Sequence, residues 1–414
     1  MENNLPSFNS NKVLAENISV AEALRMTLDA VVMPHPLSIP VADATGCVLA
    51  QDIYSPIAFP PFDQVAMDGY ALNWQQTDFS KPAKVSRTLS AGEILSEAIP
   101  TGQVVRVFTG TALPVGADTV VRQEWVKIQE GCVEFIQPNI LKGSDIRFKG
   151  EVLDANSIAL KKGDILTPGG VGFLAGLGIA EVSVFLSPAI SILITGDEML
   201  FPGEAYQHGK VYESNSIALR AALLDGGIDP NSIVFVPDDP KKIQAALEQA
   251  LSISQIVLIV GGCSVGGKDF TASVLSSAGV NIRFHRVNQR PGKPMMMGVY
   301  KDKIIFGLPG NPSTALMVFY RYVVPVIRKM LGLKNSDLPQ PYKLLGESIQ
   351  PDPVFTLFIR ARLNELDVFP LPNQESYRLD AFAKANALIV VPPGESLIEQ
   401  GSRIQVIELN AVWK

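Results

Sequence analysis

The stretch from Ile256 to Phe270 combines residue types that suit anion or metal chemistry. Five apolar residues run directly into a glycine-rich segment, which contains Gly261, Gly262, Ser264, Lys268 and Asp269. This pattern predicts a buried strand that ends in a loop, where backbone N–H groups converge on an anion without a Cβ in the way. Lys268 adds positive charge, and Asp269 can hold a metal or position a reactant. The alternative is a plain glycine-rich turn, because the P-loop spacing is absent.

Three more polar clusters follow apolar runs between residues 189 and 313. They are Asp197 with Glu198, Asp238 with Asp239, and Pro309 to Ser313. Strands and helices alternate at this spacing, which predicts an α/β domain with a mostly parallel sheet. Ligands of such sheets bind at the carboxyl ends of the strands, where all four clusters fall. We therefore expect one site built from Glu198, Asp238, Asp269 and the glycine loops.

The chemistry of these side chains suits a phosphate ligand with magnesium. The candidate Mg²⁺ ligands or general bases are the carboxylates of Asp197, Glu198, Asp238 and Asp269, since magnesium prefers oxygen. Pro309, Gly310 and Asn311 lie at the mouth of the long final helix, whose N-terminal dipole favours anions. Fixed positive charge comes from Arg290 and Lys293 in the run NQRPGKP.

Structural alternatives stand beside several of these assignments. Asp238 or Asp239 can simply cap the following helix, and Ser214 is expected to cap the helix through Leu219 and Leu223. The run Met295 to Met297 is expected to fill the core.

The first part of the chain predicts one helix and then short strands. Ser19 and Glu22 form a capping-box pattern before a helix that extends to Val32. Asp68 and Gly69 form a turn pattern, in which Asp68 can hydrogen-bond its own backbone. Thr109 lies beside a glycine at a strand end, where its hydroxyl contacts either a ligand oxygen or the turn backbone. For both residues, a hydrogen bond to the backbone of the turn is more frequent in proteins than a contact with a ligand.

The C-terminal part, from Tyr342 onward, predicts a small separate β-domain. Arg360 and Arg362 alternate outward from one of its strands. We expect both arginines to be exposed on the surface. In the functional alternative, one of them faces the neighbouring edge of the α/β sheet.

Composition excludes several classes of protein. The 414 residues exceed one ordinary core, and 47% hydrophobic with 18% charged residues indicates a globular chain. No apolar run is long enough for a membrane span, and the first residues lack a signal-peptide pattern, so a cytoplasmic location is expected. A net charge of −6 argues against nucleic-acid binding. The three cysteines and three histidines are scattered, which argues against a zinc site.

Taken in order, the motifs of the whole chain resemble the MoeA family of molybdopterin molybdenumtransferases, which is related to the gephyrin E domain. The motifs are FDQVAMDGYAL, TGTALPVGADTVV, ITGDE, ESNS, GGCSVGGKDF, RPGKP and LPGNPS. The ordered set is specific, although no single motif is. The chain departs from the family pattern at Val65, Val152, Gly267, Asp380 and Ala381.

The resemblance implies a multi-domain fold. It consists of a β-rich domain over residues 51–144, an N-terminal linker domain over 12–50 and 145–185, a central MogA-like α/β domain over 186–333, and a C-terminal β-barrel-like domain over 340–414. The implied active form is a homodimer, with the site between the α/β domain of one subunit and the PPFDQVAMDGY domain of the other.

The implied reaction takes adenylylated molybdopterin and molybdate, uses Mg²⁺, and releases AMP and molybdenum cofactor. The positions that match the family's functional motifs are Asp68, Thr109, Glu198, Asp238, Asp269, Arg290, Lys293, Pro309, Ser313 and Arg360. A molybdopterin adenylyltransferase is a candidate partner. Two alternatives remain: a catalytically weakened paralogue that binds molybdopterin or a partner protein, and a nucleotidyltransferase acting one step earlier.

Overall fold

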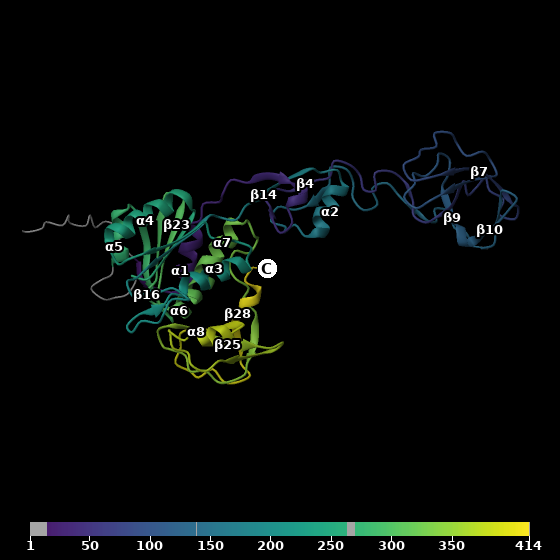
Figure 1. Cartoon of the computed structure of the whole chain (residues 1–414). Helices are drawn as coiled ribbons and strands as arrows, with labels where there is room; N and C mark the ends of the chain where they lie inside the picture. Colours follow the sequence, from purple (N-terminus) through teal and green to yellow (C-terminus); the bar gives the residue numbers. More distant parts are fainter. Residues whose placement is uncertain (1–14, 138, 263–269, 414) are drawn as a thin grey trace, which may run out of the picture. The chain divides into compact units, whose positions relative to one another are not determined.

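The computed structural model describes residues 15–137, 139–262 and 270–413, and the chain forms two compact units within it. One unit contains the residues up to Leu37 and those from Phe185 onward, and the other contains Ser38–Val184. Figure 1 shows the elements of both units, each of which is described by itself below.

A seven-stranded sheet forms the centre of the first unit. Its strands, in spatial order, are β1 (Ala15–Ile18), β20 (Asn281–Val287), β22 (Met296–Tyr300), β23 (Lys303–Leu308), β19 (Ile256–Val260), β15 (Ile190–Thr195) and β18 (Ser232–Val236). All neighbouring pairs are parallel except β20–β22 and β22–β23. The expectation of a mostly parallel α/β sheet is therefore confirmed.

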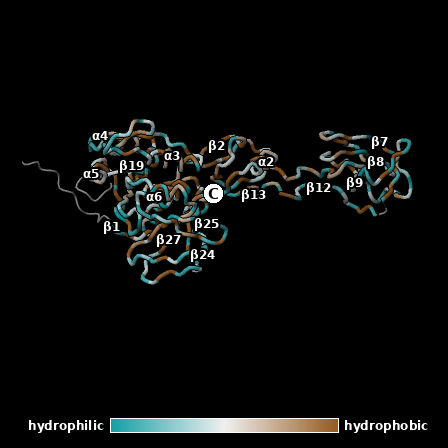
Figure 2. The backbone as a smooth tube through the Cα atoms, turned by 60° about the horizontal axis from the view of Figure 1, so that its bottom comes forward, coloured by the Kyte–Doolittle hydropathy of each residue, from teal (hydrophilic) through white to brown (hydrophobic). Residues whose placement is uncertain are grey.

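Helices cover both faces of this sheet because its strands are apolar on both sides. Alternate residues of β19, which is wholly buried and hydrophobic (Figure 2), point into two separate cores. One core contains α1 (Val20–Asp29), α3 (Asn215–Asp225), α6 (Pro312–Val318) and α7 (Val324–Met330). The other core contains α4 (Pro240–Ile253) and α5 (Phe270–Ser277). The expected Met295 to Met297 core residues are fully buried, as predicted.

The final helix differs from the expected uninterrupted one. A π-helical segment, η3 (Phe319–Val323), lies between α6 and α7. Pro325 stands just inside α7. Because proline has no N–H to donate to the carbonyl four residues earlier, the regular hydrogen-bond ladder is interrupted at Pro325, and α7 continues beyond it to Met330.

The N-terminal segment, which contains β1 and α1, packs against the α/β sheet. Strand β1 pairs in parallel with β20, and α1 buries Val20, Ala23 and Leu24 in the same core as α3 and α6. Ser19 caps α1 by accepting from the N–H of Glu22 at 3.1 Å, as the capping-box pattern predicts. Residues 12–50, expected to share one domain, are thus divided near Leu37.

Five C-terminal strands close into a small barrel, which confirms the barrel-like fold. They are β25 (Thr356–Leu363), β26 (Asp367–Pro370), β24 (Tyr342–Leu345), β28 (Arg403–Glu408) and β27 (Ala387–Val391), and β27 pairs back with β25. The short strand β21 (Gln289–Arg290) adds in parallel to β25. Helix α8 (Leu379–Lys384) and a 3₁₀ turn at Leu409–Ala411 complete this part.

The second unit is rich in short strands, as expected for the N-terminal part. Its largest sheet has the order β10 (Val126–Gln129), β11 (Cys132–Phe135), β7 (Ala83–Leu89), β8 (Gln103–Val107), β6 (Gly69–Leu72) and β9 (Thr119–Arg122). A three-stranded sheet contains β2 (Leu37–Pro40), β14 (Glu181–Phe185) and β3 (Val48–Leu49).

Smaller elements complete the second unit. Two strand pairs are β4 (Ile53–Tyr54) with β13 (Ile158–Leu160) and β5 (Gln64–Val65) with β12 (Ile146–Arg147). The helix α2 (Pro168–Gly176) packs Leu174 into a core with Val182 and Val184. Two 3₁₀ turns lie at Val41–Asp43 and Gln123–Trp125.

Two further strands, β16 (Met199–Leu200) and β17 (Val211–Tyr212), form a parallel pair that follows β15. None of the helices among the described residues is both long enough and apolar enough to cross a membrane.

The buried hydroxyl of Tyr322 provides a test of the packing in the first unit. It donates to Oε1 of Gln289 at 2.6 Å, and both residues are fully buried. We expect Tyr322→Phe to leave that acceptor unsatisfied and to lower the free energy of unfolding by about 1–3 kcal/mol. Urea titration measures the loss. The control Tyr342→Phe alters a tyrosine that is 55% exposed and should change stability by less than about 0.5 kcal/mol. Equal losses in both variants would contradict the assignment.

Candidate functional site

A cavity of about 610 Å³ lies at the carboxyl edge of the α/β sheet. The ends of β15, β18, β19 and β23 all lead into its walls, because parallel strands bring their carboxyl ends to one edge. Its size is typical of small-ligand sites. The candidate residues that line it are Glu198, Asp238, Gly261, Gly262, Pro309, Gly310 and Asn311.

The glycine after β19 is required by close packing. Gly261 has φ +100°, and a Cβ there would lie 2.6 Å from Thr195 Oγ1 and 2.7 Å from its carbonyl oxygen. The loop after β23 also approaches it, since a Cβ on Gly310 would lie 3.8 Å from Gly261 Cα. Two loops therefore meet with bare backbone at the cavity, which is the arrangement expected for close approach to an anion.

The carboxylate of Glu198 lies against the end of β15. A Cβ on Gly196 would come within 2.7 Å of Glu198 Oε2, so the absence of a side chain at Gly196 makes room for this carboxylate. Glu198 is exposed and lines the cavity. Its charge is thus available to a ligand or metal ion.

The two aspartates after β18 have different functions. Asp239 is the N-cap of α4 and accepts from the N–H groups of Lys241 and Lys242, at 2.9 and 3.3 Å. Asp238 lines the cavity, and its own N–H donates to Asp197 Oδ1 at 3.3 Å. The capping alternative therefore holds for Asp239, and Asp238 is one of the residues that line the cavity.

The ESNS segment contributes residues that were not predicted as site residues. Asn215 lines the cavity and donates from Nδ2 to the carbonyl of Gly310 at 2.8 Å, which joins α3 to the loop after β23. Its buried Oδ1 has no hydrogen-bond partner among the described residues. The motif was recognised in the sequence, but only the fold shows that its asparagine faces Gly310.

The expected side-chain cap at Ser214 is wrong. Ser214 is the N-cap residue of α3, but its side chain makes no cap hydrogen bond. The buried carboxylate of Glu213 accepts instead from the N–H of Ser216 at 2.8 Å and from its hydroxyl at 2.6 Å. A carboxylate one position earlier reaches the same free N–H groups of the first turn.

Arg360 is buried, so the default of a surface arginine is wrong. Its side chain is only 2% exposed and donates to the hydroxyl of Ser313, which is itself fully buried. It also donates to the carbonyl of Glu375 at 3.3 Å and to Oε1 of Gln374 at 3.2 Å. These acceptors satisfy the guanidinium N–H groups, which allows Arg360 to be buried. The hydroxyl of Ser313 is one of the acceptors, so it faces Arg360 and not the cavity. Arg362, two residues later, is exposed as expected.

Burial lowers the pKa of Arg360, while the nearby Glu375 opposes that shift. The same barrel loop reaches the cavity wall, because Asn311 Nδ2 donates to Ser376 Oγ at 3.0 Å and Thr314 Oγ1 donates to the Ser376 carbonyl at 3.3 Å. The loop containing Pro309 to Asn311 is therefore held from the barrel on one side and by Asn215 on the other.

Arg290 and Lys293 are not among the residues that line the cavity, although Pro294 is. The guanidinium of Arg290 forms an ion pair with Asp352 at 2.9 Å and lies 4.4 Å from the centre of the Phe355 ring. Lys293 Nζ lies 5.0 Å from the same ring centre. Two cations thus share one aromatic ring, and Arg290 remains 61% exposed.

Asp68 and Thr109 contact each other in the second unit. Oδ1 of Asp68 accepts from both the N–H and the hydroxyl of Thr109, each at 2.8 Å. These bonds span 41 residues, so the expected local turn bond of Asp68 is replaced by a long-range pair. The two hydrogen bonds, followed by the charge of Arg106, lower the pKa of Asp68, because they stabilise the ionised carboxylate.

Ser264, Lys268 and Asp269 lie outside the described residues. Within residues 15–137, 139–262 and 270–413, no cluster of three or more His, Cys, Asp and Glu side chains is placed to hold a metal ion. Glu198 and Asp238 both line the cavity. Magnesium is usually held by one or two carboxylates together with water and substrate phosphates, so the chemistry of these two residues suits it.

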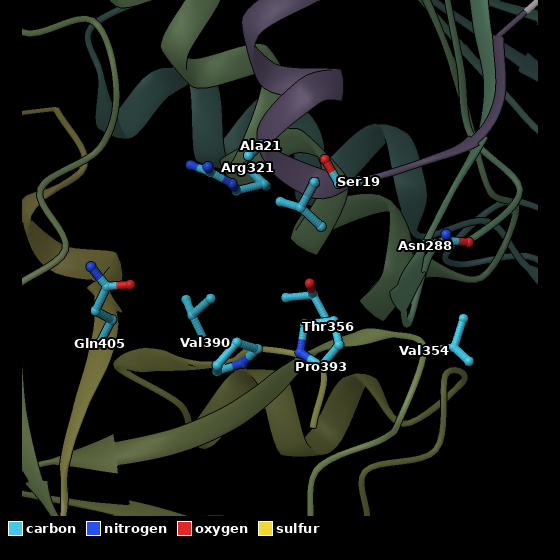
Figure 3. A pocket seen from close by; sticks show the side chains of 11 residues that line it. Ser19, Ala21, Asn288, Arg321, Val354, Thr356, Val390, Pro393 and Gln405 are labelled. Carbon is cyan, nitrogen blue, oxygen red and sulfur yellow. The ribbon is translucent and has the colours of Figure 1, made fainter. Parts of the chain in front are cut away.

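A second cavity, of about 340 Å³, contains none of the candidate residues (Figure 3). It lies between the start of α1, at Ser19 to Ala21, and barrel residues such as Thr356 and Pro393. Arg321 on its wall pairs with Asp337 at 2.7 Å.

Comparison with known families covers most of the chain. The description "MoeA N-terminal region (domain I and II)" matches residues 18–178, "Probable molybdopterin binding domain" matches 191–329, and "MoeA C-terminal region (domain IV)" matches 344–409. The fold and the cavity therefore define a multi-domain protein with an α/β domain of the molybdopterin-binding type.

Individual relatives cover nearly the full length. The molybdopterin molybdenumtransferase of Haemophilus influenzae is 32% identical over 378 residues, covering 89% of this chain and 92% of that protein. The enzyme of the same name from Nostoc sp. is 32% identical over 380 residues, covering 88% and 87%. The crystal structure of the molybdopterin biosynthesis MoeA protein from Pyrococcus horikoshii superposes with a TM-score of 0.82 at 28% identity, covering 95% and 99%. The chain belongs to the MoeA family of molybdopterin molybdenumtransferases.

Gly261 and Gly203 form a matched pair for testing the loop contact. Their φ values are +100° and +99°, but a Cβ on Gly203 would meet nothing within 4 Å. Alanine at either position should cost about 1–3 kcal/mol of backbone strain. We expect Gly261→Ala to lose at least about 1 kcal/mol more, because the new methyl group overpacks Thr195. Urea unfolding measures both variants, and equal losses would show that the contact with Thr195 is unimportant.

Proposed function

We propose that the chain inserts molybdenum into adenylylated molybdopterin, releasing AMP and molybdenum cofactor. The observation that carries this proposal is the full-length similarity to molybdopterin molybdenumtransferases, together with a carboxylate-bearing cavity in the α/β domain. The substrates are adenylylated molybdopterin and molybdate, and the reaction takes place in the cytoplasm. The molybdopterin adenylyltransferase, which makes the first substrate, is the proposed delivery partner.

The reaction adds water across the phosphoanhydride that joins AMP to molybdopterin. A P–O bond to water oxygen forms, the bridging P–O bond breaks, and a carboxylate accepts the proton. The two dithiolene sulfurs then replace two oxygens of molybdate, which leave as water together with the two thiol protons and two protons from solution, with no change in the oxidation state of molybdenum. The bare backbone at Gly261, Gly262 and Gly310 suits the phosphate groups. Arg290 and Lys293 lie outside the cavity lining, and their proposed contribution is positive charge from the segment that precedes Pro294. Asp68 and Thr109 form a second preorganised contact, in which Thr109 fixes the carboxylate in its ionised form.

Glu198 and Asp238 are the proposed magnesium ligands among the described residues, with Asp269 as the third and Ser264 and Lys268 as further substrate contacts. A bound Mg²⁺ supplies positive charge to the phosphate oxygens. The chain's own residues orient the anhydride and accept the proton released by the attacking water. Ser313 and Arg360 do not line the cavity, and their proposed role is to hold the loop from Pro309 to Asn311 in place.

The carboxylate pair supplies the direct test of this function. We expect Glu198→Gln and Asp238→Asn each to slow AMP release from adenylylated molybdopterin by about 100-fold or more, with a higher Mg²⁺ concentration needed for half-maximal rate. AMP release and reconstitution of an apo-molybdoenzyme are measured in the presence of molybdate. The control Glu248→Gln removes one charge from the exposed surface of α4 and should match wild type. A wild-type protein that binds the substrate without releasing AMP would support a binding paralogue instead.

The active form is proposed to be a homodimer, on the basis of the family to which the chain belongs. Light scattering coupled to size-exclusion chromatography should give a mass of about twice the 44.7 kDa of one chain. A mass that stays at one chain at micromolar concentration, in fully active protein, would reject the dimer.

A further inference from the structure

The rim of the α/β cavity contains an exposed tyrosine that no step above uses. Tyr212 on β17 lines the cavity and is 44% exposed. It is the only aromatic residue among the described residues that line this cavity. We infer that Tyr212 is a specificity-determining residue, which stacks against a planar heteroaromatic ring of the substrate.

Several contacts fix the position of Tyr212. Strand β17 pairs with β16, so that Tyr212 lies opposite Leu200, and the next residue, Glu213, donates its N–H to the Leu200 carbonyl at 2.8 Å. At the far end of the side chain, the phenol hydroxyl donates to the carbonyl of Glu204 at 2.8 Å. A ring that is tethered at both ends loses little rotamer freedom when a ligand covers it.

The other described residues that line the cavity include no aromatic ring. They are carboxylates such as Glu198 and Asp238, bare backbone at Gly261 and Gly310, and further small polar and aliphatic residues. These groups suit the charged and metal-bound parts of the substrate. They give no preference for a ligand with a heteroaromatic ring over a ligand without one. An exposed tyrosine ring leaves apolar area in water, and stacking of a base on an aromatic side chain contributes about 1–3 kcal/mol. Tyr212 therefore supplies the selectivity for the ring.

This inference rests on the proposed function, since adenylylated molybdopterin contains two planar aromatic surfaces, the adenine and the pyrimidine ring of the pterin. Adenine and the pterin share the chemistry that Tyr212 recognises, namely a flat, partly polar heteroaromatic surface. Separate binding measurements with AMP and with a simple pterin distinguish the two sources. Ribose 5-phosphate provides the matching ligand that has a phosphate and no ring.

The test uses the full-length protein with Tyr212→Leu, which keeps an apolar side chain and removes the ring. Isothermal titration calorimetry should show about 10-fold weaker binding of either AMP or the pterin, equivalent to about 1.4 kcal/mol, with ribose 5-phosphate binding unchanged. The ligand that loses affinity is the one that Tyr212 contacts. Tyr212→Phe keeps the ring and should retain binding to within about threefold, since only the tether to Glu204 is lost.

Tyr206→Leu is the matched control, because Tyr206 is 66% exposed, lies between β16 and β17 and does not line the cavity. It should bind all three ligands as wild type does. Unchanged affinity of Tyr212→Leu for both rings would overturn the inference, and so would an equal loss for ribose 5-phosphate, which indicates general distortion. Wild-type protein that binds neither ring would also overturn it. The binding measurements need no turnover, so absent AMP release in a protein with ring-selective binding would reject only the proposed reaction.

Discussion

The structure of the candidate site depends on the close approach of two backbone loops at one edge of a parallel sheet. Gly261, after β19, lies so close to Thr195 that any side chain would overlap it, and a Cβ on Gly310, after β23, would lie 3.8 Å from the Gly261 Cα. Because neighbouring parallel strands end at the same edge, the loops must share this space. Small residues at the contact leave backbone N–H groups and the carboxylates of Glu198 and Asp238 around a single cavity.

The C-terminal barrel stabilises this arrangement from outside the cavity. Buried Arg360 holds Ser313, and Ser376 holds Asn311 and Thr314, so that the loop after β23 is fixed between the barrel and Asn215 of α3. A buried guanidinium is costly unless its N–H groups find acceptors, and backbone carbonyls with Gln374 supply them. The barrel thus contributes to the cavity although none of its residues lines it.

In the second unit, Thr109 positions the side chain of Asp68 in a similar way. The carboxylate is held by two hydrogen bonds from a residue 41 positions away, and these bonds favour its ionised form. The position of the Asp68 carboxylate is therefore fixed by a partner that only the fold brings close.

The sequence by itself determined the α/β alternation, the glycine loop after a buried strand and the position of the carboxylates, because apolar periodicity and glycine placement are local signals. It also identified the family through its ordered motifs. Only the tertiary structure decided that Arg360 is buried, that Glu213 rather than Ser214 caps α3, and that Asp68 bonds Thr109 rather than its own turn. Each of these outcomes depends on a partner that the fold brings close. A hydrogen bond to such a partner produces no pattern of apolar spacing in the neighbouring sequence, so the sequence alone does not reveal it.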